Sequence, residues 1–285
     1  MANAPQFYFI KQALRSYFCS EVSVQDAEDP ALFRAQMLLN DHSPDDDLVA
    51  STSNVINVLV GVSAASYVAQ LAVIVYAWHL TGTNPLRFVP IETLETSIDT
   101  VTAEFTSQQR IFDVSFTAIS SFVAAADGGD DRDTLMATTM LVNDIGGARG
   151  LLTLLGFRQT VGSRTVAPLT FHQCLAAFAE RHTVREPLTV GARAFSKHCT
   201  RSLSGWWGEY KGNDAAKNIQ AETKVRDLLA TATWKNIHSL PHAHATMEIR
   251  NLMGYGARWD TEIFKFRGFL EPPMLNGHAI KWRHL

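Results

Sequence analysis

The sequence predicts a mainly α-helical protein with two lobes and an irregular C-terminal arm. Apolar side chains recur at helical spacing over most of its 285 residues, and charge divides it into an acidic and a basic part. Residues 1–150 hold 7 Lys and Arg against 18 Asp and Glu, a net charge of −11, and residues 151–285 hold 18 against 10, a net charge of +8. We therefore expect an acidic helical lobe at 1–148, a basic helical lobe at 149–267 and an extended arm at 268–285.

The acidic lobe is expected to begin with two helices. In residues 6–21 the apolar side chains follow i, i+3, i+4, i+7 and i+8 spacing, which places them on one face of a helix. Asp29-Pro30 is a favourable start for a second helix through Leu39, because Asp caps free backbone N–H groups and Pro fits the first helical position. The periodicity predicts further helices within residues 91–125 and 133–143.

A long apolar stretch lies in the middle of the acidic lobe. Residues 55–78 contain no charged side chain in 24 positions, which is long enough to span a membrane. The stretch also contains Asn57, Ser63 and Gln70, and no Lys/Arg clusters flank it. Gly61 could separate two shorter helices. We expect a buried helix or helix pair at the centre of the lobe, and no membrane partner.

The basic lobe is expected to be helical, with little β structure. Thr170 and Gln173 form a capping box before a helix that runs to His182, and Asp214 can cap a helix through about Trp234. Two more helices are expected after Pro187 and at residues 246–255, and residues 156–168 are the main β-leaning stretch.

The helix after Pro187 has a basic side. Arg193, Lys197 and Arg201 are spaced i, i+4 and i+8, which places three cations in one row on the helix surface. No carboxylate lies between Pro187 and Gly208 to neutralise them. Such a row favours a polyanion such as a phosphate backbone, although an ordinary helix with a solvated basic face has the same pattern.

Positive charge is interleaved with aromatic residues throughout the basic part, as at Arg258-Trp259 and Lys265-Phe266. Basic grooves follow the phosphates of single-stranded nucleic acid, and aromatic rings stack on its bases. We therefore predict that this part binds single-stranded RNA. The candidate RNA-binding residues are Arg193, Lys197, Arg201, Trp206, Arg226, Arg250 and Arg258.

The sequence contains no recognisable catalytic motif, and it predicts neither an enzyme nor a bound cofactor. His238, His242 and His244 are the best candidates for metal ligands, and Glu248 follows them. No HExxH or similar motif surrounds them, so we expect no metal ion. The three cysteines are widely spaced and form no disulfide framework, which indicates a reducing compartment.

Three segments in the second half of the chain carry a resemblance to a known group of proteins. They are Arg193-Ala194-Phe195 with Cys199 and Trp206, the segment Asn218-Ile219-Gln220-Ala221, and the tail at 268–285. In these segments the chain resembles the coat proteins and nucleoproteins of RNA viruses that build helical particles. The resemblance implies a largely α-helical protein that packages single-stranded RNA in the virion or the host cytoplasm. It also implies a homo-oligomer whose subunits join through arms at 1–20 and 268–285.

Two alternatives remain open on the residues alone. The first is a helical, oligomeric scaffold protein without nucleic acid, in which the basic part of one copy contacts the acidic part of another. The second is a metal-dependent enzyme with a metal ion at His238, His242 and His244.

Overall fold

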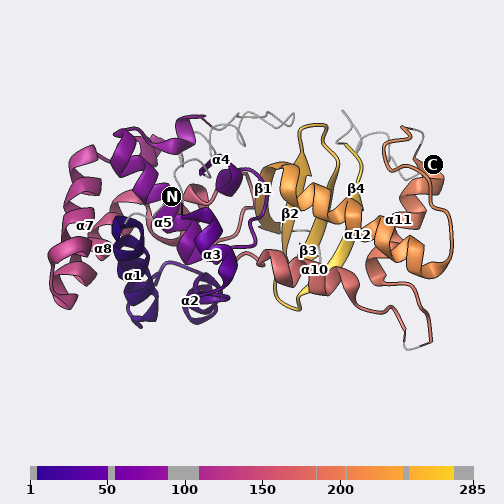
Figure 1. Ribbon diagram of the computed structural model, residues 1–285, viewed down its shortest axis with the longest axis horizontal. Helices are drawn as coiled ribbons and strands as arrows, with labels where there is room; N and C mark the ends of the chain where they lie inside the picture. Colours follow the sequence, from indigo (N-terminus) through magenta and orange to yellow (C-terminus); the bar gives the residue numbers. More distant parts are fainter. Residues whose placement is uncertain are drawn as a thin grey trace.

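The computed structural model describes residues 5–50, 55–88, 109–183, 185–202, 204–239 and 244–272. Within these ranges, helices precede a four-stranded antiparallel sheet near the C-terminal end (Figure 1). The prediction of a mainly α-helical protein is therefore wrong, and the fold is mixed α and β. Residues 268–270, expected to begin an irregular arm, lie in the last strand, and residues 273–285 lie outside the described residues.

The first part of the chain is a group of helices at one end of the molecule (Figure 1). They are α1 (Pro5–Cys19), α2 (Pro30–Leu38), α3 (Pro44–Val49), α4 (Val55–Leu59), α5 (Tyr67–Thr81), the 3-10 helix η2 (Pro85–Phe88), α7 (Phe116–Gly128), α8 (Asp131–Ile145) and α9 (Gly147–Leu154). Helices were expected within 91–125, and residues 91–108, about half of that stretch, lie outside the described residues.

Helix α5 is the centre of this helical group. Every residue from Tyr67 through Trp78 is buried, and α5 packs against α1, α2, α3 and α7. This burial on all sides explains why residues 67–78 carry no charge, and α5 is the buried helix expected at the centre of the lobe. The short helix α4 is buried on one side only, because Ile56 is 44% exposed. Within the described residues, no helix is both long enough and apolar enough to cross a membrane.

Helix boundaries follow the local capping chemistry. The Asp29 carboxylate caps α2 by accepting a hydrogen bond from the Leu32 N–H at 2.9 Å, as expected. The expected capping box of Thr170 and Gln173 is present at the start of α10 (Phe171–Ala179). Helix α8 begins two residues before the expected 133, and its cap is Asp130, whose carboxylate accepts from the Asp133 N–H at 2.8 Å.

The sheet is a simple antiparallel meander in the order β1, β2, β3, β4. The strands are β1 (Ala232–Ser239), β2 (Ala245–Asn251), β3 (Gly256–Asp260) and β4 (Lys265–Leu270). The prediction of a helix at 246–255 is wrong, because this segment forms β2 and the turn into β3. Its alternation of apolar and polar side chains, as in Met247-Glu248-Ile249-Arg250, has the period of a strand.

One face of the sheet packs on helices. α10, α11 (Val190–Arg201) and α12 (Asp214–Thr231) cover it, and α12 runs across the strands in Figure 1. Met247, Ile249 and Trp259 are fully buried, and the Trp259 Nε1–H donates to the Cys174 carbonyl oxygen of α10 at 3.0 Å. Helix α12 is capped by Asn213 rather than Asp214, and it ends at Thr231 because the chain passes directly into β1.

Strand β1 also joins the sheet to the helical group. The ammonium group of Lys235 is buried and donates to the Gly61 carbonyl oxygen at 2.7 Å, at the end of α4. Burial, and to a smaller extent the charge of Arg158, lower the pKa of Lys235 from 10.5 to about 7. The Gly61 N–H donates to the Ala232 carbonyl oxygen at 2.6 Å. The buried apolar residues of both regions belong to one continuous core.

Candidate active site

The face of the sheet opposite α10–α12 is polar. The strand register places Glu248 of β2 between Asn236 of β1 and Arg258 of β3. In the neighbouring row, Thr246 lies between His238 and Asp260. Because successive residues of a strand point to opposite faces, the buried apolar residues of β2 and β3 lie on one face and these polar ones on the other. We call this second surface the polar sheet face.

Glu248 is the centre of the polar sheet face. Its Oε2 is 3.1 Å from His238 Nε2 and 2.6 Å from Arg258 Nε, and its Oε1 is 2.5 Å from Arg250 Nε. The Glu248 side chain is only 4% exposed, so these partners replace water around its charge. One carboxylate therefore orients one imidazole and two guanidinium groups.

The charge state of Glu248 follows from these contacts. Burial by itself raises the pKa of the carboxyl group. The hydrogen bond from His238 and the positive charges of Arg250 and Arg258 outweigh burial, and together they lower the pKa of Glu248 from 4.5 to about 2. Glu248 is thus ionised at neutral pH and accepts hydrogen bonds without donating any.

The ionised carboxylate determines which nitrogen of His238 carries the proton. Because Glu248 only accepts, Nε2 is the protonated nitrogen, and in the neutral ring Nδ1 keeps a free lone pair. Nδ1 makes no hydrogen bond with any described residue, and the side chain is 17% exposed. This is the arrangement of a general base, in which a carboxylate orients the imidazole and the other nitrogen accepts a proton.

A segment outside the named strands supports the polar sheet face at the free edge of β1. The Arg164 N–H donates to the Ile237 carbonyl oxygen at 2.8 Å, so residues near 164 run along this edge. Asn236 is fully buried; its Oδ1 accepts from Ser163 Oγ at 2.9 Å, and its Nδ2 donates to Thr160 Oγ1 at 2.8 Å. These bonds hold β1 in place beside His238.

A second histidine has its own carboxylate on the polar sheet face. His244 Nδ1 is 3.2 Å from both carboxylate oxygens of Asp260, and Arg267 Nη1 is 3.3 Å from Asp260 Oδ2. Asp260 is fully buried, whereas the His244 side chain is 47% exposed. His242 lies outside the described residues, and among the residues that are described no three His, Cys, Asp or Glu side chains gather as a metal site.

The structure divides the seven candidate RNA-binding residues between different surfaces. Arg250 and Arg258 both contact Glu248 on the polar sheet face. Arg226 of α12 pairs with Glu222 at 2.7 Å on the same helix. The polar sheet face therefore brings together only two of the seven, Arg250 and Arg258.

The basic row of α11 is only partly unpaired. Arg193 Nη1 is 2.6 Å from Glu186 Oε2 and 2.8 Å from His182 Nδ1, so a carboxylate just before Pro187 neutralises this cation. Lys197 and Arg201 are exposed, and neither forms an ion pair with a described residue. The solvated cations of α11 are thus two rather than three.

Trp206 is half-buried and packs against neighbouring side chains. Its ring stacks on Tyr255 with a centroid distance of 4.0 Å and an interplanar angle of 4°. Lys224 Nζ lies 4.0 Å from the Trp206 ring centroid, and it also donates to the Trp206 carbonyl oxygen at 3.1 Å. An ammonium group and a ring cannot occupy the same face at these distances, so both faces of Trp206 are covered.

The buried His198 links α11 to the end of β4. His198 Nδ1 of α11 is 2.8 Å from Glu271 Oε1, and the same oxygen accepts from Trp207 Nε1 at 2.7 Å. Arg250 Nη1 donates to the Glu271 carbonyl oxygen at 2.9 Å. These contacts attach the end of β4 to α11.

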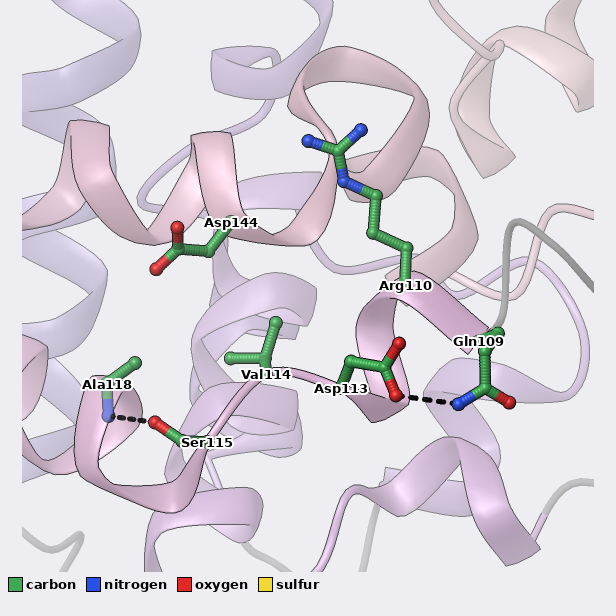
Figure 2. A pocket seen from close by; sticks show the side chains of 7 residues that line it. All are labelled: Gln109, Arg110, Asp113, Val114, Ser115, Ala118 and Asp144. Atoms are coloured by element: carbon green, nitrogen blue, oxygen red, sulfur yellow. Dashed lines mark hydrogen bonds between the residues drawn. The ribbon is translucent and has the colours of Figure 1, made fainter.

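A hollow in the helical group is a weaker candidate site. It is lined by Gln109, Arg110, Asp113, Val114, Ser115, Ala118 and Asp144 (Figure 2). Gln109 Nε2 donates to Asp113 Oδ1 at 2.7 Å, and Ser115 Oγ accepts from the Ala118 N–H at 3.2 Å as the cap of α7. These hydrogen bonds stabilise the local helices, and no histidine lines the hollow among the described residues.

From the sequence alone, we considered His238, His244 and Glu248 only as candidate metal ligands. Asn236 and Asp260 were not among the candidate site residues. The signal that could have found them is the alternation of apolar and charged residues in Met247-Glu248-Ile249-Arg250 and Ala257-Arg258-Trp259-Asp260. It predicts two strands with charged residues on one face.

The same alternation explains the interleaved aromatic and basic residues. Trp259 points into the core beneath α10, while its neighbour Arg258 points to the opposite face. At Arg258-Trp259, the alternation that was interpreted as a sign of single-stranded RNA binding therefore reflects the two faces of one strand.

Comparison with known proteins overturns the resemblance to viral coat proteins and nucleoproteins. A family model described as the CdiA C-terminal tRNase toxin domain matches residues 178–271, about a third of the chain. Neither a search of curated proteins nor a search of solved structures found a match. The predicted packaging of single-stranded RNA, self-assembly through terminal arms and location in the virion or host cytoplasm are contradicted, as are the scaffold and metal-enzyme alternatives.

The prediction that the chain is not an enzyme is contradicted as well, because a tRNase is a nuclease. The matched stretch begins at Phe178 in α10 and ends just after β4, so it contains α11, α12 and all four strands. Both histidine–carboxylate pairs of the polar sheet face, His238–Glu248 and His244–Asp260, lie within it. Over residues 178–271, the chain is similar to the CdiA C-terminal tRNase toxin domain.

Proposed function

We propose that this chain is a ribonuclease that cleaves tRNA, and that the polar sheet face is its active site. The observation that carries the proposal is the arrangement of His238 on the ionised Glu248 beside Arg258, inside the stretch that matches a tRNase domain. Residues 178–271 hold 14 Lys and Arg against 10 Asp and Glu, which favours a polyanionic substrate.

The chemistry available to these groups is cleavage of the RNA backbone by its own 2′-hydroxyl group. His238 Nδ1 accepts the proton of the 2′-OH as its oxygen attacks the adjacent phosphorus atom. The bond between the 2′ oxygen and phosphorus forms, and the bond between phosphorus and the 5′ oxygen breaks. The leaving oxygen takes up a proton, and the products end in a 2′,3′-cyclic phosphate and a 5′-hydroxyl group.

The two arginines on Glu248 have different roles in this proposal. Arg250 is buried, and its other hydrogen bonds go to the Gly254 and Glu271 carbonyl oxygens, so it positions Glu248. The Arg258 side chain is 29% exposed, and only its Nε has a partner among the described residues. Its two terminal nitrogens can therefore stabilise the negative charge that develops on the phosphate.

Lys197 and Arg201 of α11 contribute to binding rather than to chemistry. Both are solvated, and contacts from such cations to RNA phosphates release counterions. We expect Lys197→Ala and Arg201→Ala to raise KM, leave kcat unchanged and weaken the salt dependence of tRNA binding.

The test uses the full chain and a pool of purified tRNA. The wild type should cleave tRNA to products with cyclic phosphate ends, and His238→Ala should lower kcat/KM by about 10²- to 10⁴-fold. His172→Ala is the matched control, since His172 is an exposed histidine whose carboxylate partner, Asp45, lies 3.5 Å away in the helical group. A wild-type protein without activity on tRNA, or a His238→Ala variant with full activity, would refute the proposal.

A further inference from the structure

The proposed cleavage moves two protons, and His238 accounts for one of them. The departing 5′ oxygen of a ribose is a poor leaving group, so its departure is faster when an acid protonates it. The second group must lie on the same face as His238, be able to give up a proton and be exposed to the substrate. His244 meets these conditions among the described residues.

The strand register places the two histidines side by side. His238 of β1 lies opposite Thr246 of β2, and His244 precedes Thr246 by two residues. Residues two apart in an extended segment point to the same face, so His244 is the diagonal neighbour of His238 on the adjacent strand, and such neighbours lie roughly 7–8 Å apart. The contact between His244 and Asp260, which lies opposite Thr246, confirms that His244 faces the polar sheet face. Two side chains in this relation can reach one phosphodiester group from two sides.

His244 has two carboxylates beside its ring, whereas His238 has one within the part of the chain that the structure describes. The buried Asp260 carboxylate accepts a hydrogen bond from His244 Nδ1. The Glu262 carboxylate lies 3.8 Å from His244 Nε2. Among the described residues, Arg267 is the one Lys or Arg that pairs with Asp260, with Nη1 at 3.3 Å. His238 instead shares its carboxylate, Glu248, with two arginines. A carboxylate near each ring nitrogen can orient an N–H at either position, which is the geometry that a proton donor needs.

We propose that His244 is the general acid of the cleavage reaction, an inference that rests on the proposed ribonuclease function. His238 Nδ1 takes the proton of the 2′-OH, and the protonated His244 gives its Nε2 proton to the 5′ oxygen as the bond to phosphorus breaks. His238 ends as the imidazolium and His244 as the neutral imidazole. Exchange with water then restores both groups, so protons and charge balance over the cycle.

The test removes the need for the acid. The linkage that the wild type cleaves is first mapped on a tRNA, and the same tRNA is then made with sulfur in place of the 5′ oxygen at that linkage. A thiolate leaves without protonation. His244→Asn should slow cleavage of the oxygen linkage by about 10²- to 10³-fold and cleave the sulfur linkage at close to the wild-type rate. His238→Asn should slow both, because the 2′-OH still has to be deprotonated.

The outcomes separate the two proposals. Equal slowing of both linkages by His244→Asn, or no slowing of either, would overturn the assignment of His244 while the ribonuclease proposal stands. A wild type that does not cleave the natural tRNA would overturn both. His182→Asn is the matched control, because His182 is exposed and has its own carboxylate neighbour, Glu186, at 3.6 Å. Full activity of His244→Asn on the sulfur linkage also shows that the variant is folded.

Discussion

Replacement of Glu248 by glutamine tests the electrostatic centre of the polar sheet face without changing its shape. The side chain is 4% exposed and contacts His238, Arg250 and Arg258 at 2.5–3.1 Å. Glutamine has the same size but carries no charge, so two buried or partly buried guanidinium groups lose their counter-charge. Removing one member of a buried ion pair is strongly destabilising for this reason.

The magnitude follows from the pKa of Glu248. A fall from 4.5 to about 2 corresponds to about 3 kcal/mol of stability at neutral pH, since one pKa unit is worth about 1.4 kcal/mol. Because the side chain is almost completely buried, solvent screens little of this energy. We expect Glu248→Gln to lower the free energy of unfolding at pH 7 by about this amount.

The dependence on pH has a definite sign. The folded-state pKa is depressed, so the contribution of Glu248 is complete above pH 4.5 and is lost as pH falls toward 2. At pH 3, Glu248 is protonated in the unfolded state and largely ionised in the folded state. Its contribution to the free energy of unfolding is then about 1.4 kcal/mol. Urea denaturation of the wild type and Glu248→Gln at pH 7 and pH 3 measures both differences.

A matched control is Glu209→Gln, since Glu209 pairs with Lys211 on the surface and both side chains are 74% exposed. This variant should change stability by less than about 1 kcal/mol at either pH. A Glu248→Gln difference below about 1 kcal/mol, or one that does not shrink between pH 7 and pH 3, would refute the assignment of a buried, ionised Glu248.

Three further predictions concern the elements that hold the sheet in place. The depressed pKa of Lys235 means that the unfolded state binds more protons between pH 7 and 10.5, so stability should rise there by up to about 1.4 kcal/mol per pH unit. Urea denaturation at pH 7, 8 and 9 should show this rise in the wild type but not in Lys235→Met. Gly191→Ala places a methyl group 2.2 Å from ring carbons of Phe178 and should cost about 1–3 kcal/mol, seen as a lower Tm, whereas Gly128→Ala meets no atom within 4 Å and should not lower Tm. Thr170→Ala removes the capping box of α10 and should cost about 1 kcal/mol in urea denaturation, and an unchanged midpoint would contradict that role.

Features that depend on neighbouring residues in the chain could be predicted from the sequence. Residues 67–78 of the uncharged stretch are buried in α5, and the starts of α2 and α10 are capped by Asp29 and by Thr170 with Gln173. In each case, residues within a few positions of one another supply both the apolar periodicity and the hydrogen bonds. Such signals need no knowledge of distant contacts.

The C-terminal sheet could not be predicted in the same way. Residues 245–260 contain helix-compatible residues, and a helix was expected over 246–255, yet the segment forms β2 and β3. A strand is stabilised by its partners, and those of β2 lie in β1 and β3. The helical expectation failed because side chains distant in sequence decide whether this segment pairs.

The sequence by itself determined the buried helical centre, the caps, and the concentration of positive charge and histidine in the second half of the chain. Only the tertiary structure decided which of those groups act together. His238, Glu248 and Arg258 are separated by ten residues at each step, and they meet because the register of two hairpins aligns them across three strands. The same register pairs His244 with Asp260, whereas Lys197 and Arg201 lie on α11, which packs against β4. Charge and residue type are properties of the chain, whereas contact across strands depends on register, which backbone hydrogen bonds and core packing determine together.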